Sequence, residues 1–345
     1  MKKEIWKYFE KYHNHILEQL KKTYHQHSNG RPNPFHLEND CLTHTKMVYE
    51  KVKTENVNVL IAAILHDVGK IYTRVEKESG RVSFFGHENV SMVYAIGILN
   101  KMEKVFPKIE KKLILEMIAW HGQLWRKKNS DQRTKLINQK FSHDKFYENF
   151  LQLVKADAYG RIIEPDNEKH RIDEDFIFLE NYIPFNLNKY TNFKPTKEVI
   201  MMVGLSGSGK STYIKNYINN KYKIISLDKY FEKQKLDYDS INYKKQSKKA
   251  HIEVLKEINE CIKKEDNVVI DMTNLSQEQR RKKLSLFPDT KYKKIGILIL
   301  KDIEEIKKNL KNRKGKSLSE EVLNKQIENF ELPGLDEFHE IKYIF

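Results

Sequence analysis

One stretch of the chain has the residue types and spacing of a phosphate-binding loop. Residues 198–212 read EVIMMVGLSGSGKST and fit the pattern G-x-x-x-x-G-K-[ST]. The fixed positions of that pattern are occupied by Gly204, Gly209, Lys210 and Ser211. The apolar run 199–203 predicts a buried strand before the loop, and 212–219 predicts a helix after it. Both flanks that such a loop needs are present, which favours phosphate binding over a glycine-rich turn that binds nothing.

The chemistry of this loop is the binding of a nucleoside triphosphate. Glycines let backbone N–H groups close around the phosphates, and the start of the following helix adds a partial positive charge. Lys210 would reach the outer phosphates, and the Ser211 hydroxyl would ligate Mg²⁺. We therefore expect ATP or another NTP, with Mg²⁺, to be bound by Gly204, Ser206, Gly207, Ser208, Gly209, Lys210, Ser211 and Thr212.

A second group of residues combines histidine with aspartate. Its members lie in predicted helices or at helix edges and are His44, His66, Asp67, His87, His121 and Asp157. The segment 61–65 before the adjacent His-Asp pair is too apolar for a surface, so the pair ends a buried helix. A buried carboxylate beside a buried imidazole is costly unless it is paired or bound to a metal. Imidazoles with carboxylates suit a divalent transition metal. The alternative is a set of ordinary core histidines and capping aspartates.

Two cations follow members of this group at helical spacing. Lys70 comes four residues after His66, and Arg161 comes four residues after Asp157. Residues four apart share a helical face. Both side chains could therefore lie against a phosphate that the metal holds.

The order H…HD…D, with the HD-x-G-K form after the pair, resembles the HD-domain phosphohydrolases. The resemblance implies an all-helical bundle with His44, His66, Asp67 and Asp157 as metal ligands. It also places His87 and His121 as ligands of a second metal or as contacts to the phosphate, although either histidine alone could be structural. The implied chemistry is metal-assisted hydrolysis of a phosphoester, in which Lys70 and Arg161 neutralise the phosphate oxygens. Mn, Co, Ni or Fe would suit such a ligand set better than Mg²⁺.

Composition limits the classes of protein that fit. The chain of 345 residues is long enough for two domains. Its net charge of +15 favours a polyanionic partner such as nucleic acid, although a lysine-rich composition overall would give the same count. Two cysteines exclude a disulfide framework and a paired-cysteine zinc site. No apolar run is long enough for a bilayer and the start lacks a signal peptide core, so we expect a cytoplasmic protein without a membrane partner.

The N-terminal segment predicts a first helix. Apolar and aromatic residues recur at helical spacing over 3–27. Four histidines lie in it or at its end, and we expect them to be solvated rather than metal ligands: His13, His15, His25 and His27. A short helix at 176–182 is expected to close this half of the chain.

Beyond residue 197, predicted strands and helices alternate. The strands are expected at 198–204, 222–226, 267–271 and 292–300, and the helices at 209–219, 245–264, 276–284 and 302–312. Such alternation predicts a mostly parallel sheet wrapped by helices. The expected domains are 1–183 and 197–345, joined by a linker at 184–196 that carries two prolines and no periodicity.

Asp228 follows the strand expected at 222–226. Ligands of such sheets bind at the carboxyl ends of the strands, so Asp228 would face the transferable phosphate and could accept a proton from an acceptor hydroxyl. The alternative is an N-cap for the next turn. The run 280–283, RRKK, would by itself be a solvated helix face.

The segment VVIDMTNLSQEQRRKK at 268–283 resembles the polynucleotide 5′-hydroxyl kinases. The resemblance implies that Lys210 and Ser211 hold ATP and Mg²⁺, that Asp228 is the general base, and that Arg313 belongs to a lid over the phosphates. A second lid arginine is absent unless Lys314 or Lys316 substitutes for it.

One position departs from the kinase pattern. Phe231 stands where the family carries an arginine that holds the acceptor's phosphate. Its ring, or that of Tyr230, could stack on the terminal base, and Lys229 could supply a point charge. Phe231 could equally be a core residue.

The two halves in this order resemble the HD-domain polynucleotide kinases, which heal broken RNA or DNA ends. The resemblance implies that the HD half removes 2′,3′-cyclic phosphate and 2′/3′-phosphate ends, that the kinase half phosphorylates 5′-OH ends, and that a separate nucleic-acid ligase acts afterwards. Two alternatives remain: a nucleotide-metabolism or signalling enzyme with a small-molecule kinase, and a nucleic-acid-binding module whose sites are inactive.

Overall fold

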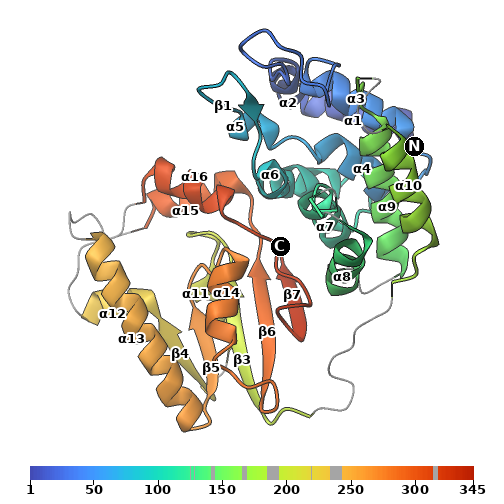
Figure 1. Cartoon of the computed structure of the whole chain (residues 1–345). Helices are drawn as coiled ribbons and strands as arrows, with labels where there is room; N and C mark the ends of the chain where they lie inside the picture. The colour runs from blue at the N-terminus through green and yellow to red at the C-terminus, as the bar shows by residue number, and fades with distance from the viewer. Residues whose placement is uncertain are drawn as a thin grey trace. The chain divides into compact units, whose positions relative to one another are not determined.

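The chain forms two compact units in the computed structural model. They comprise Met1–Leu187 and Asn188–Phe345 (Figure 1). The structure describes all residues except 125, 128, 141–143, 165–168, 185–193, 219, 234–242 and 314–317. Most of the predicted linker therefore lies outside the described residues. Among those residues, no helix has the length and apolar character needed to cross a membrane.

The first unit is helical, as the resemblance to HD domains implied. Its described helices are α1 (Lys2–Tyr12), α2 (Asn14–Lys21), α3 (Cys41–Lys51), α4 (Val57–Leu65), α5 (Lys70–Thr73), α6 (His87–Met102), α7 (Lys111–Trp120), α8 (Ser130–Lys140), α9 (Asp144–Tyr159) and α10 (Lys169–Asn181). A small hairpin, β1 (Val75–Glu76) and β2 (Val82–Ser83), follows α5. The final helix, α10, starts seven residues before the position predicted for it.

Helix α4 forms the centre of this unit. Its sequence VNVLIAAIL is apolar on every face, and each of its residues is buried. It packs against α3, α7 and α9, the helices that carry or precede His44, His121 and Asp157. Burying a Leu or Ile side chain contributes about 1.5–3 kcal/mol. This packing therefore fixes the end of α4, where the His66-Asp67 pair begins.

The predicted first helix is broken at His13. The backbone there leaves the helical region (φ −131, ψ 22) and separates α1 from α2. The His13 side chain is buried and packs against the Phe9 ring at 5.1 Å between ring centroids. The helical period is therefore interrupted at His13, and the prediction of one helix over 3–27 was wrong.

Gly69 brings the turn after the His-Asp pair against the start of α6. A Cβ atom at this position would lie 2.1 Å from the His87 carbonyl oxygen and 2.6 Å from the Ser91 nitrogen. The Gly69 N–H donates to Ser91 Oγ at 2.7 Å. Only a glycine allows this approach, which explains the glycine of the HD-x-G-K sequence.

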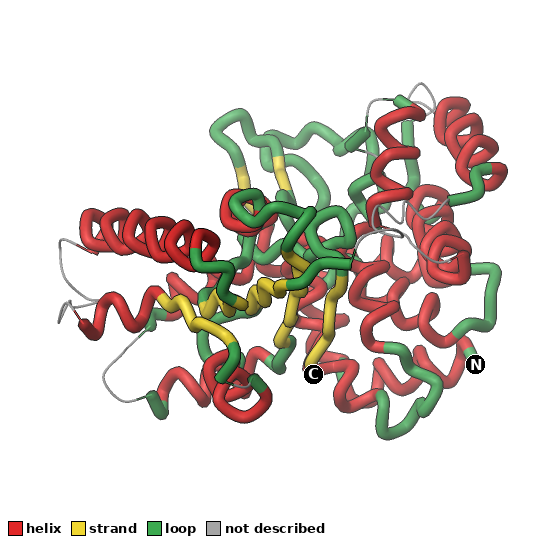
Figure 2. The backbone as a smooth tube through the Cα atoms, turned by 90° about the horizontal axis from the view of Figure 1, so that it is seen from below, coloured by secondary structure: helices red, strands yellow, loops and turns green. Residues whose placement is uncertain are grey.

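The second unit is a parallel sheet with helices on both sides, as predicted (Figure 2). Its strands are β3 (Lys197–Val203), β4 (Tyr222–Ser226), β5 (Asn267–Asp271), β6 (Tyr292–Ile299) and β7 (Glu340–Ile344), in the order β4-β5-β3-β6-β7. All neighbouring pairs are parallel. Its described helices are α11 (Lys210–Tyr217), α12 (Leu227–Lys233), α13 (Tyr243–Lys263), α14 (Gln277–Leu284), α15 (Ile303–Lys311) and α16 (Glu320–Glu328). The sequence did not predict α12, α16 or β7.

Candidate active sites

Four histidines of the first unit share one orientation. The Nδ1 atoms of His66, His87 and His121 lie 2.9, 2.8 and 2.7 Å from the carbonyl oxygen three residues earlier, and His44 Nδ1 lies 3.1 Å from the Gly160 carbonyl. A carbonyl oxygen only accepts, so each Nδ1 carries the proton and donates it. Each Nε2 therefore presents a lone pair, which is the form of histidine that binds a metal.

The four Nε2 atoms surround the carboxylate of Asp67. His44 and His66 approach Oδ2 at 3.4 and 3.2 Å, and His87 and His121 approach Oδ1 at 3.1 and 3.8 Å. Asp157 Oδ1 lies 3.1 Å from His44 Nε2 and 3.8 Å from His66 Nε2. The fold thus brings together all six residues that the sequence singled out.

This donor set fits divalent cations. The histidine lone pairs face carboxylate oxygens, and acceptors that face each other in a buried site repel unless a cation lies between them. Among the described residues, His66 Nε2 and Asp67 Oδ1 are buried without a hydrogen-bond partner, whereas Asp67 Oδ2 lies 2.7 Å from Lys70 Nζ. Two groups have ligand atoms close enough for one ion each, and they share Asp67: His44, His66 and Asp67, and Asp67, His87 and His121.

The two predicted cations lie against carboxylates of this site. Lys70 Nζ is 2.7 Å from Asp67 Oδ2 and is buried, whereas Arg161 Nη2 is 2.6 Å from Asp157 Oδ2 and remains partly exposed. Burial raises the pKa of Asp67, but His66 and Lys70 outweigh it and hold that pKa well below its ordinary value. For Asp157, Arg161 has the same effect on the pKa against burial. Both carboxylates are therefore ionised at neutral pH.

Arg161 also lines two cavities beside this site. One has a volume of about 670 Å³ and the other about 860 Å³. Further cations line them: Arg31 and Arg81 in the first, and Lys51, Lys53 and Lys155 in the second. The positive side chains that line these cavities could neutralise the phosphates of a polyanionic chain.

The expectation that the N-terminal histidines are solvated was partly wrong. His13 and His25 are buried, at 3% and 0% exposure, whereas His15 is exposed and His27 is half-buried. His25 lies beyond α2, in the loop before α3. Its burial depends on contacts with residues outside α2, and the helical spacing of the sequence does not predict such contacts.

The glycine-rich loop of the second unit has the backbone that phosphate binding requires. Gly204, Gly207 and Gly209 have φ values of 153, 81 and 101, which side-chain-bearing residues rarely adopt. Lys210 begins α11, and its Nζ donates to the carbonyls of Gly204 and Leu205 at 2.9 and 2.7 Å. Ser206, Gly207 and Ser208 lie within the turn, and Ser211 and Thr212 in the first turn of α11.

Two carboxylates lie at the ends of the neighbouring strands. Asp271, the last residue of β5, accepts a hydrogen bond from Ser211 Oγ at 3.1 Å. Burial, together with the charge of Asp228, raises the pKa of Asp271 although Ser211 and Lys210 oppose it. A strand-ending acid beside the loop serine is the typical holder of Mg²⁺ in phosphate-binding loops. No role for Asp271 was predicted from the sequence.

Asp228 lies in the first turn of α12, and Arg313 follows α15. Arg313 Nη2 donates to Asp228 Oδ2 at 3.1 Å. The sequence predicted both residues for one site, and the fold brings them into contact. Lys314 and Lys316, the suggested second lid cations, lie outside the described residues.

Of the two roles left open for Phe231, the structure favours the core, and the expectation for the run 280–283 was wrong. The Phe231 ring is fully buried, so it offers no surface on which a base could stack. Arg280 is also fully buried and makes a paired contact with Glu337 at 2.7 and 2.9 Å. The run 280–283 is therefore not a solvated face, because two of its side chains, those of Arg280 and Lys283, turn into the fold.

Comparison with protein families gives one match for each half. Residues 40–165 match the HD domain, and residues 199–333 match the AAA domain.

Two curated proteins show similarity over part of the chain. The "Putative bifunctional polynucleotide phosphatase/kinase" of Acanthamoeba polyphaga mimivirus is 34% identical over 122 residues, which are 35% of this chain and 25% of that protein. "Heterogeneous nuclear ribonucleoprotein U-like protein 2" of Homo sapiens is 25% identical over 190 residues, or 49% of this chain and 25% of that protein. The chain thus spans about a quarter of the length of either relative.

Two solved structures resemble parts of the fold. A chain of the Pnkp1/Rnl/Hen1 RNA repair complex is 20% identical with a TM-score of 0.35, over 40% of this chain and 45% of that one. A gluconokinase from Sinorhizobium meliloti is 17% identical with a TM-score of 0.30, over 44% of this chain and 85% of that one.

Proposed function

We propose that this chain, which carries an HD domain followed by an AAA-type P-loop domain, is a bifunctional enzyme that heals broken RNA or DNA ends. The HD half hydrolyses 2′,3′-cyclic phosphate and 2′/3′-phosphate ends, and the P-loop half transfers the γ-phosphate of ATP or another NTP to a 5′-OH end. The observation that carries the proposal is the presence of both constellations in one chain: histidine lone pairs around Asp67, and a phosphate-binding loop beside Asp271 and Asp228. The name of the mimivirus relative, a bifunctional polynucleotide phosphatase/kinase, supports it.

In the HD half, the residues that would hold the metals are His44, His66, Asp67, Asp157, His87 and His121. Mn, Co, Ni or Fe suit these imidazoles and carboxylates. A divalent ion there would supply a Lewis acid for the phosphate and would lower the pKa of water. Lys70, which contacts Asp67, holds that carboxylate in place and in its ionised form. Arg161 borders both cavities, so its guanidinium is positioned to neutralise phosphate oxygens of a substrate.

In the P-loop half, backbone N–H groups from 204 to 212 would bind the triphosphate and Lys210 would contact its outer phosphates. Ser211 and Asp271 would hold the Mg²⁺ that accompanies ATP. Asp228 would accept the proton of the 5′-hydroxyl, and Arg313, which now donates to Asp228, would neutralise charge on the transferred phosphate.

The cavities next to Arg161 favour a polynucleotide over a small phosphoester. More positive side chains line these cavities than are needed to neutralise one terminal phosphate. The net charge of +15 also favours binding of a polyanion by the whole chain. The domain boundaries that we propose are 1–183 and 197–345. A separate ligase would seal the ends that this chain prepares.

The test uses an RNA with a 5′-OH and a 2′,3′-cyclic phosphate, together with ATP and Mg²⁺, with and without Mn²⁺, Co²⁺ or Ni²⁺. We expect 5′ phosphorylation with Mg²⁺ alone and removal of the cyclic phosphate only with a transition metal. Lys210→Ala should abolish the first reaction and spare the second, and His66→Ala should do the reverse. Activity on free nucleotides with none on oligonucleotides would instead indicate a nucleotide-metabolism enzyme.

A further inference from the structure

The loop between α2 and α3 is long but held at its base. The His25 N–H donates to the Asn39 carbonyl at 2.7 Å, and the Cys41 N–H donates to the Thr23 carbonyl at 2.9 Å. Residues 26–38 between these bonds, all of them described, contain no helix or strand. A loop of this length without secondary structure is usually functional. It also forms much of the 670 Å³ cavity, whose lining includes residues 31–36.

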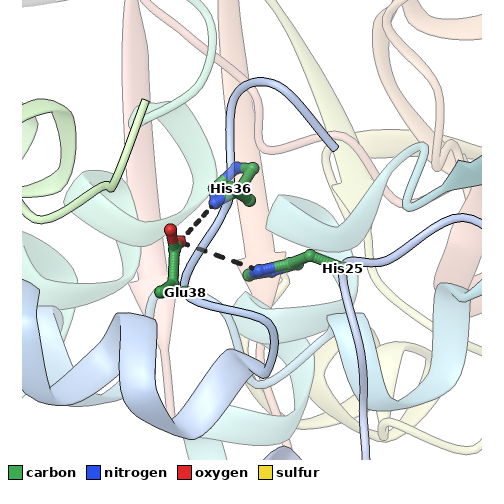
Figure 3. A group of neighbouring side chains, drawn as sticks. All are labelled: His25, His36 and Glu38. Carbon is green, nitrogen blue, oxygen red and sulfur yellow. Dashed lines mark hydrogen bonds and ion pairs between the residues drawn. The ribbon is translucent and has the colours of Figure 1, made fainter. Parts of the chain in front are cut away.

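Three imidazoles surround one oxygen of Glu38 inside this loop. Glu38 Oε1 lies 2.7 Å from His36 Nδ1, 3.1 Å from His44 Nδ1 and 3.8 Å from His25 Nδ1. Figure 3 shows His25 and His36 turned toward the Glu38 carboxylate. The side chains of His25 and Glu38 are fully buried, and 14% of the His36 side chain is exposed.

The charges of this cluster are not balanced by a permanent cation. Among the described residues, the ion pairs of Glu38 within 4 Å are all with histidines. An ionised carboxylate in a buried position is costly unless a cation neutralises it. Lys70 Nζ lies 2.7 Å from Asp67 Oδ2 and 3.3 Å from His25 Nε2, and it is not among these ion pairs of Glu38. The Ile162 N–H donates to Glu38 Oε2 at 3.0 Å, but it carries no charge.

His25 shows the same deficiency. Its Nδ1 is buried without a hydrogen-bond partner among the described residues. Its Nε2 already has two neighbours, Cys41 Sγ at 3.2 Å and Lys70 Nζ at 3.3 Å. Nδ1, the ring nitrogen without a partner in the described part of the chain, lies 3.8 Å from Glu38 Oε1. A cation would bind both atoms there once the ring proton is on Nε2, where it can donate to the Cys41 sulfur.

We propose that His25, His36 and Glu38 bind a divalent transition-metal ion, in addition to the ions around Asp67. Two imidazoles and a carboxylate are a donor set for such ions. Ligands about 2.1 Å from one ion are at most about 4.2 Å apart, and Glu38 Oε1 lies within that distance of both nitrogens. All the ligand atoms of this cluster lie within 4.8 Å of one another.

The ion would cross-link the loop and stabilise the neighbouring site around Asp67. His25 and Glu38 stand at the two ends of the loop and His36 stands within the cavity wall, so one ion fixes the wall relative to α3. Glu38 also contacts Nδ1 of His44, the residue whose Nε2 faces Asp67. This role goes beyond the proposed end-healing function and does not depend on it.

The experiment measures bound cobalt per chain after dialysis of the full-length protein against Co²⁺. His36→Gln should lose about one equivalent of bound cobalt per chain, because a site with three protein ligands binds its ion weakly once one ligand is removed. His25→Gln should lose the same amount. His27→Gln is the matched control, because His27 lies in the same loop and lines the same cavity but is outside the cluster. The comparison is repeated in a His66→Ala/His87→Ala chain, which weakens both Asp67 groups and leaves the Lys70–Asp67 pair intact.

Hydrogen exchange of residues 26–38 gives a second readout. Added Co²⁺ should slow exchange in the His66→Ala/His87→Ala chain and have no effect on it once His36→Gln is added. Unchanged cobalt content in His36→Gln and His25→Gln would overturn the proposal, as would loop exchange that ignores Co²⁺. Either result would show that His25, His36 and Glu38 form only a hydrogen-bonded network. Loss of end-healing activity in other variants would not affect this outcome.

Discussion

Ser211 and Asp271 are joined by a hydrogen bond of 3.1 Å, although 60 positions separate them in the chain. The serine is the second residue of helix α11 after the phosphate-binding loop, and the aspartate ends the adjacent strand β5. Both oxygens therefore face the place where the Mg²⁺ of a bound triphosphate would lie.

Asp271→Asn should lower kcat/KM of the 5′ phosphorylation by about a hundredfold or more, because the charge that holds Mg²⁺ is lost while the side-chain shape is kept. The measurement is γ-phosphate transfer to a 5′-OH oligonucleotide. Hydrolysis of the cyclic phosphate by the same sample should be unchanged and serves as its control. An Asp271→Asn chain with full kinase activity would remove this residue from the Mg²⁺ site.

Gly69→Ala should disrupt the HD site without a change in any ligand. The added Cβ would lie 2.1 Å from the His87 carbonyl, so the turn after Asp67 must move away from α6. We expect a loss of stability of about 1–3 kcal/mol and a large loss of phosphate-end hydrolysis. Gly30→Ala is the control for the steric contact, since a Cβ there meets nothing within 4 Å. Its φ of 77 adds backbone strain, so this variant should lose some stability but keep the activity. Equal activities in the two variants would contradict the requirement for close approach.

The parallel sheet of the second unit could be predicted from local sequence, whereas the helical bundle of the first unit was implied by the resemblance to HD domains. Contacts between distant residues could not be predicted in either unit. The apolar runs of β3, β5 and β6 and the loop glycines define the parallel sheet, because buried strands and turns leave local signatures. By contrast, β7 reads EIKYI and has no fully buried residue; it is a strand only because β6 offers it a partner.

The sites divide in the same way. His44, His66, Asp67, His87, His121 and Asp157 could be selected because of the types of residue and their order. The burial of His25 could not, since it depends on the Glu38 and Cys41 side chains that the loop brings to it. Likewise, the helical period favoured a solvated Arg280 because it contains no information about Glu337. This residue lies 57 positions later in the chain and forms the buried ion pair with Arg280.

Arg81→Ala should affect long substrates more than short ones. Arg81 is exposed, lines the cavity next to Arg161 and is not in either metal-binding group around Asp67, so we expect it to bind backbone phosphates of a polynucleotide. KM for a phosphate-ended oligonucleotide should rise about tenfold, while hydrolysis of a small aryl phosphate stays the same. Arg74→Ala, at an exposed arginine paired with Glu76, is the matched control. An equal effect of Arg81→Ala on both substrates would contradict a role in polynucleotide binding.

Phe231→Ala should act on stability rather than on substrate binding. The ring is fully buried, and truncation of a buried Phe costs about 3–5 kcal/mol. Thermal unfolding should therefore shift strongly, and KM for the 5′-OH oligonucleotide should be unchanged in the folded fraction. Tyr230, which is half-buried, is the neighbour whose ring remains available, so Tyr230→Ala should raise that KM. The reverse pattern would return the stacking role to Phe231.

His13 gives the first unit a stability that depends on pH. Burial, with smaller contributions from Lys101 and His15, lowers the pKa of His13 to about 4, against about 6.5 in the unfolded chain. Between pH 6.5 and 4 the unfolded state binds a proton that the folded state does not, so the free energy of unfolding falls as the pH falls through this window. Each pH unit costs at most about 1.4 kcal/mol. His13→Gln should flatten this part of the curve measured by urea unfolding at pH 4.5, 5.5 and 7, whereas His15→Gln, at an exposed histidine, should not. If the slopes of the two variants equal that of the parent chain, the buried imidazole is not the source of the dependence.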